Sequence, residues 1–202
     1  YNCRITLETA DFLPNEGIDQ RFLDELWRKI ERASTGKKPG RAHAYIQLWE
    51  PLTDELYFGL ERNGITLLER LDAVSYRAAF TLASLDWLRG VFDEFEGSSI
   101  RAISKIELSH KCDSSLIYLC DPTQPKNGKN LDVPNFLDFG DGYFLYSVTF
   151  HHDVQFDEAL ELLRRVGIDF DEYTEIGSES FGSNNSLELV FHASLAENIV
   201  AD

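Results

Sequence analysis

The sequence predicts an α+β protein: a mainly antiparallel sheet of several strands with about three amphipathic helices packed on one face. Residues 141–167 carry the clearest evidence, because their apolar side chains first alternate and then recur at helical spacing. Apolar positions at helical spacing also occur in residues 18–33 and 85–96. Fourteen Phe, eight Tyr and three Trp in 202 residues argue against disorder and provide enough apolar surface for a buried core.

The first part of the chain predicts a strand, a helix and then an antiparallel meander. Residues 3–9 alternate as a half-buried strand, and the helix over residues 18–33 follows a loop. Asn63-Gly64 predicts a hairpin turn, because this dipeptide favours the tight turn between paired strands. The meander strands are predicted at residues 42–49, 56–60, 65–71 and 76–82.

Further elements follow from the same periodicities. Ser84 is placed to cap a second helix, over residues 85–96. Asp153 is placed to cap the third helix, and Gly167 is placed to end it. The remaining strands are predicted at residues 100–109, 116–119, 144–150 and 187–195, with a long irregular stretch at residues 121–141.

The length predicts a single α+β domain over residues 1–202. A weak internal sequence repeat leaves a second domain organisation open. Three times a predicted helix carries Phe near Asp-Glu, at residues 22–26, 92–95 and 156–160. The chain would then consist of two similar strand–helix halves, at about residues 1–98 and 99–202.

The net charge of −16 is unevenly distributed along the chain. Residues 1–41 hold eight Lys or Arg against seven Asp or Glu, which leaves a balance of −17 for residues 42–202. A negative field of this size repels nucleic acid and anionic membrane surfaces, and it attracts basic proteins. We therefore expect no nucleic-acid or membrane partner, and a basic protein partner instead.

Cysteine usage indicates a reducing compartment. The chain has three cysteines, Cys3, Cys112 and Cys120, without a regular disulfide framework. No apolar run approaches the roughly 20 residues needed to span a bilayer, and no signal peptide is visible. These features predict a cytoplasmic location.

The most informative candidate site is an acidic tract interleaved with aromatic side chains. A ring can anchor a protein–protein contact while the carboxylates steer a basic partner toward it. The predicted partner-binding residues are Asp169, Asp171, Glu172, Tyr173, Glu175 and Glu179. The competing interpretation is a solvated strand or loop edge.

Catalytic and metal sites have weaker support. His151-His152 lies where a strand passes into a helix, and alternation places His152 on the core side and His151 away from it. His192 could approach this pair if the last strand is its neighbour, but no zinc-ligand spacing is present. Cys112 would need a histidine base to act as a nucleophile. We therefore predict no cofactor, no metal and no catalytic residue.

Together these features predict an acidic cytoplasmic binding protein that inhibits a basic protein by stoichiometric association. The target would be a nucleic-acid-handling enzyme or a toxin, and the protein would act as an immunity protein, inhibitor or antitoxin. Two alternatives remain open: an enzyme of unknown type with a site around His151/His152 or Cys112, and a small-ligand sensor domain with a pocket under residues 121–141.

Overall fold

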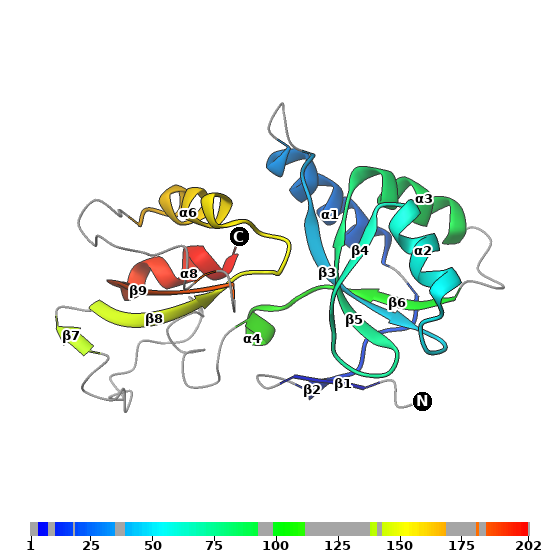
Figure 1. Cartoon of the computed structure of the whole chain (residues 1–202), viewed down its shortest axis with the longest axis horizontal. Helices are drawn as coiled ribbons and strands as arrows, with labels where there is room; N and C mark the ends of the chain where they lie inside the picture. Colours follow the sequence, from blue (N-terminus) through cyan, green and yellow to red (C-terminus); the bar gives the residue numbers. More distant parts are fainter. Residues whose placement is uncertain are drawn as a thin grey trace. The chain divides into compact units, whose positions relative to one another are not determined.

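The computed structural model describes residues 4–7, 11–17, 19–34, 39–92, 99–111, 138–140, 143–168, 181 and 185–201. The α+β class is confirmed: helices pack on mainly antiparallel sheets. The chain divides into two compact units, Tyr1–Glu107 and Leu108–Asp202 (Figure 1). Whether these units form a single domain stays a prediction.

The first unit is a four-stranded sheet with three helices on one side (Figure 1). Its strand order is β4-β5-β3-β6, and every neighbouring pair is antiparallel. The elements are β1 (Ile5–Thr6), β2 (Asp11–Phe12), α1 (Gln20–Ala33), β3 (Ala42–Leu48), α2 (Asp54–Arg62), β4 (Ile65–Arg70), β5 (Ser75–Phe80), α3 (Leu82–Phe92) and β6 (Ile100–Ser104).

Alternation along the strands separates an apolar face from a polar face. On β3, Ala44, Ile46 and Leu48 join the hydrophobic core. The helices complete this core with Leu23, Leu26, Ile30, Leu60, Leu85 and Leu88. Tyr45 and Gln47 point to the opposite face, where the β1–β2 pair lies: the Phe12 and Tyr45 ring centroids are 5.3 Å apart.

The second unit contains a smaller three-stranded sheet in the order β7-β8-β9. Antiparallel pairing sets Tyr146 opposite Leu189 and Val148 opposite Leu187, and this face forms a second core with Ala159 and Leu163. The described elements are α4 (Leu108–Lys111), β7 (Asp138–Gly140), β8 (Tyr143–Thr149), α6 (Phe156–Arg165), β9 (Ser186–His192) and α8 (Ala193–Ala201).

The predicted meander is wrong in two respects. Residues 56–60 belong to helix α2 rather than to a strand. Asn63-Gly64 does not form a hairpin turn, because Asn63 is the C-cap of α2 and Gly64 adopts the left-handed conformation that ends a helix, with φ +79°. As a result β3 pairs with β5 and β6, and β4 lies at the edge of the sheet.

Several predicted boundaries also move. The strand predicted at residues 100–109 ends at Ser104, and Leu108–Lys111 forms α4. Helix α3 begins earlier than predicted, since Thr81 and Ser84 form a reciprocal cap: the Thr81 N–H donates to Ser84 Oγ at 2.9 Å and the Ser84 N–H donates to Thr81 Oγ1 at 3.4 Å. Helix α6 is preceded by Gln155 rather than capped by Asp153. The last strand ends at His192, and residues 193–195 belong to α8 instead. The predicted strand at residues 116–119 lies outside the described residues.

Gly64 offers a test of the α2–β4 turn. A Cβ atom there would lie 2.3 Å from Thr81 Oγ1, and alanine disfavours a φ of +79°. We expect Gly64→Ala to lower the free energy of unfolding by about 1–3 kcal/mol. Gly59→Ala, in the adjacent helix where a Cβ meets no atom within 4 Å, should raise it by up to about 1 kcal/mol. Equal effects of both substitutions in urea unfolding would contradict this account of the turn.

Candidate functional site

The predicted partner-binding tract is the first candidate. Asp169, Asp171, Glu172, Tyr173, Glu175 and Glu179 all lie outside the described residues. Cys112, Cys120 and nearly all of the 121–141 stretch lie outside them as well.

The histidine pair is arranged differently from the prediction. His152 is exposed and His151 is half-buried, the reverse of what alternation indicated, because β8 ends at Thr149 and a turn follows. His192 lies opposite Tyr143, at the far end of β8 from His151. At about 3.4 Å per residue this separation is roughly 25 Å, so His192 does not join the pair. Among the described residues, no three His, Cys, Asp or Glu side chains gather as metal ligands.

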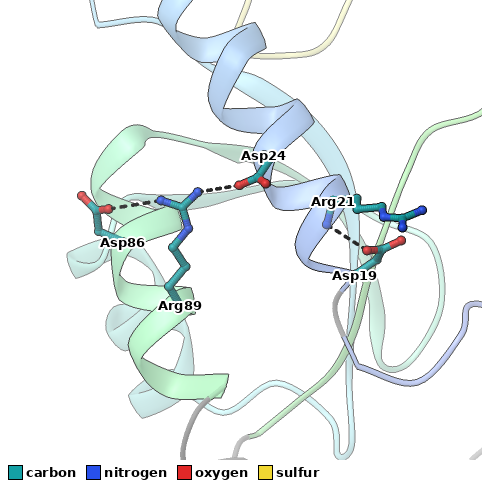
Figure 2. Close-up of polar contacts among 5 residues, drawn as sticks. All are labelled: Asp19, Arg21, Asp24, Asp86 and Arg89. Atoms are coloured by element: carbon teal, nitrogen blue, oxygen red, sulfur yellow. Dashed lines mark hydrogen bonds and ion pairs between the residues drawn. The ribbon is translucent and has the colours of Figure 1, made fainter.

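A charged cluster connects helices α1 and α3 (Figure 2). Arg89 Nη2 lies 2.9 Å from Asp24 Oδ1, and Arg89 Nη1 lies 3.9 Å from Asp86 Oδ1. The Arg89 guanidinium also stacks over the Trp27 ring at 4.8 Å. Figure 2 also shows Asp19, whose side chain accepts from the Arg21 N–H at 2.8 Å and so caps α1. These partially exposed contacts have an evident structural role, worth up to about 1 kcal/mol for such a pair.

The outer face of α2 combines exposed rings with carboxylates. Asp54, Tyr57, Phe58 and Glu61 follow the i, i+3, i+4, i+7 spacing of one helical stripe. Phe58 is 61% exposed and Tyr57 is 38% exposed, and the two rings meet edge-on with centroids 5.5 Å apart. Asp54 is exposed and Glu61 is half-buried, and Glu55 adds a second exposed carboxylate in the first turn. We call these five residues the α2 outer face.

Local chemistry explains why these residues form a helix with this orientation. Thr53 accepts the Leu56 N–H at 3.2 Å as the N-cap, and the acids of the first turn suit the positive end of the helix dipole. Leu56 and Leu60, on the opposite stripe, pack into the core. Burying Leu60 and Leu56 therefore turns the Tyr57 and Phe58 rings toward solvent.

Sequence reasoning missed this face, because it assigned residues 56–60 to a strand. The signals that identify the helix were nevertheless present: a Thr N-cap followed by Asp54 and Glu55, and Asn-Gly at the C-terminal end. A short apolar run does not distinguish a strand from a helix by itself.

A second polar arrangement lies on the sheet face opposite the helices. Gln47, Ser75 and Arg101 come from three neighbouring strands and are all buried. Tyr45 lies on the same face, and burial raises the pKa of its hydroxyl despite the opposing effect of the Arg77 guanidinium. The Tyr45 hydroxyl is therefore protonated at neutral pH.

Helices of the described part of the chain are all too short or too polar to cross a membrane. No family model, no curated protein and no solved structure matches the chain.

Proposed function

We propose that this chain is an acidic binding protein that associates stoichiometrically with a basic protein and docks it on the α2 outer face. The observation that carries the proposal is the exposed Tyr57–Phe58 ring pair among acidic side chains, on a helix whose other stripe is buried. Large aromatic side chains dominate the binding energy of protein interfaces when they become buried there.

Charge complementarity indicates the kind of partner. Asp54, Glu55 and Glu61 flank the rings, and the whole chain carries a net charge of −16. Carboxylates around an apolar centre steer a basic surface toward it and repel acidic competitors. The acidic tract from Asp169 to Glu179 contributes to that net charge. Occlusion of a basic active site, as by an immunity protein, inhibitor or antitoxin, is the biological form we propose.

The test has two stages. Affinity capture from the native host at low salt, with a salt gradient for elution, identifies a basic partner by mass. Calorimetric titration of that purified partner then compares the wild type with Tyr57→Ala/Phe58→Ala. We expect the double substitution to weaken binding by about 30-fold or more, the effect of losing a central aromatic contact.

Matched charge variants separate docking from general electrostatics. One variant neutralises three acids on α2, as Asp54→Asn, Glu55→Gln and Glu61→Gln. The control neutralises three on α6, as Asp157→Asn, Glu158→Gln and Glu161→Gln, and therefore has the same net charge. We expect the α2 variant to slow association and flatten its salt dependence more than the control does. If both variants behave alike and the ring substitutions change nothing, the α2 outer face is not the docking surface.

A further inference from the structure

Arg101 occupies an irregular position in the sheet of the first unit. Gln47 pairs with Ala102 and Leu48 pairs with Ile100, so Arg101 is the extra residue of a bulge on β6. Bulges redirect side chains and are frequent beside functional sites. Here the bulge directs Arg101 to the polar face, where the residue is only 8% exposed.

One amino group of the guanidinium is firmly held. Arg101 Nη1 donates to Gln47 Oε1 at 2.5 Å and to the Pro14 carbonyl at 3.3 Å. Gln47 Nε2 in turn donates to Ser75 Oγ at 2.9 Å, which fixes the orientation of the amide. The Arg101 carbonyl accepts the Gly17 N–H at 2.8 Å. Backbone and side chain are thus both held in place before any ligand arrives.

The other edge of the guanidinium is available. Neither Nε nor Nη2 of Arg101 has a hydrogen-bond partner within the described part of the chain. A nitrogen without a hydrogen-bond partner is either fully buried or in contact with solvent, and neither Nε nor Nη2 of Arg101 is fully buried. This edge of the guanidinium therefore reaches the surface. Beside it, 5.7 Å from Cζ, stands the ring of Trp49, which is 43% exposed.

Within the described part of the chain no ion pair joins Arg101 to a carboxylate, in contrast to four other arginines. Arg4, Arg77, Arg89 and Arg165 each lie within 2.7–3.6 Å of a carboxylate oxygen. Over the described ranges Arg101 has only neutral acceptors, in a chain with 35 Asp and Glu. A guanidinium that keeps one edge open to solvent gains strong charge-assisted hydrogen bonds when an anion reaches that edge.

We propose that Arg101 and Trp49 form a binding site for a small organic carboxylate that carries a flat apolar group. The Nε–Nη2 edge matches the two oxygens of a carboxylate in a bidentate pair. The exposed Trp49 ring offers a stacking surface for the flat group. Gln47 and Ser75 are positioning residues that hold the guanidinium. This site is independent of the proposed docking of a basic protein on α2.

Titration calorimetry with benzoate as the probe tests the site. We expect one benzoate to bind per chain, and benzamide, its neutral counterpart, to bind at least about tenfold more weakly because it lacks the charge. Arg101→Lys, which keeps the charge but loses the planar edge, should weaken benzoate binding about tenfold or more. Arg89→Lys is the matched control and should bind as the wild type does, since Arg89 belongs to the α1–α3 cluster.

Further measurements keep the test decisive. Thermal unfolding establishes whether Arg101→Lys is folded, and if it is not, Trp49→Ala replaces it. Trp49→Ala should reduce the preference for benzoate over acetate by about fivefold or more, because stacking is lost while the charge remains. Absence of benzoate binding, equal binding to the Arg101 and Arg89 variants, or an unchanged preference in Trp49→Ala would overturn the proposal. Tighter binding of inorganic phosphate than of benzoate at Arg101 would overturn the ligand class.

Discussion

Gly40→Ala is expected to lower the free energy of unfolding of the first unit by about 3 kcal/mol. A Cβ atom on Gly40 would lie 2.1 Å from the Ile30 carbonyl oxygen and 2.7 Å from the Ser34 nitrogen. Both are backbone atoms at the end of α1, so no side-chain rotation can relieve the contact. The Gly40 N–H also donates to Ser34 Oγ at 3.0 Å, and this hydroxyl donates to the Ile30 carbonyl at 2.8 Å.

Separating α1 from the start of β3 would disturb both the cap and the core residue Ile30. Urea unfolding followed by tryptophan fluorescence measures the effect, because Trp27, Trp49 and Trp87 all belong to the first unit. At about 4 °C per kcal/mol for a unit of this size, the melting temperature should fall by roughly 12 °C.

Gly90→Ala is the matched control for Gly40→Ala. Gly90 lies within α3, and a Cβ there would meet no atom within 4 Å. Alanine favours a helix over glycine by about 0.5–1 kcal/mol, so this variant should be slightly more stable than the wild type. Equal stability of the Gly40 and Gly90 variants would show that the end of α1 is not packed against Gly40.

Phe80→Ala is expected to lower the free energy of unfolding by about 3–5 kcal/mol. Phe80 is fully buried and stands between Ala42 on β3 and Ile65 on β4, its direct partners in the sheet. Removing the ring takes apolar surface from the centre of the core and leaves a cavity that strands paired on both sides cannot close. The measurement is again urea unfolding followed by tryptophan fluorescence.

Phe58→Ala provides the control for this loss of a phenylalanine. Because the Phe58 ring is exposed on α2, its removal should change stability by no more than about 0.5 kcal/mol. The same variant is expected to lose partner binding. Comparing it with Phe80→Ala therefore distinguishes a side chain that stabilises the fold from one that binds the partner. Should Phe58→Ala destabilise the chain as much as Phe80→Ala does, the Phe58 ring contributes to packing and is not available to a partner.

Local patterns were sufficient for the fold class and for most elements. A strand or helix with one buried face shows a periodic pattern of apolar side chains within a short stretch of sequence. This pattern is the alternation in residues 144–150 and the helical spacing in residues 18–33. Gly167, with φ +99°, ends α6 where the sequence placed the end of that helix. Residues 56–60 were misassigned because five residues are too few to separate the two periods.

Local sequence patterns did not predict the candidate sites. The acidic composition alone suggested a basic partner, and it still supports that proposal. The exposure of Tyr57 and Phe58 depends on which stripe of α2 meets the core, and that choice is made by Leu60 and its distant neighbours.

The polar face of the sheet was even harder to predict, because it also depends on contacts between distant residues. Arg101, Gln47 and Ser75 lie 54 and 28 positions apart along the chain, and only the strand order β5-β3-β6 brings them together. The sequence by itself determined the fold class, most of the strands and helices and the sign of the charge, since these follow from local composition and spacing. The tertiary structure decided which rings face solvent and which polar groups surround Arg101, because these depend on contacts between residues far apart in sequence.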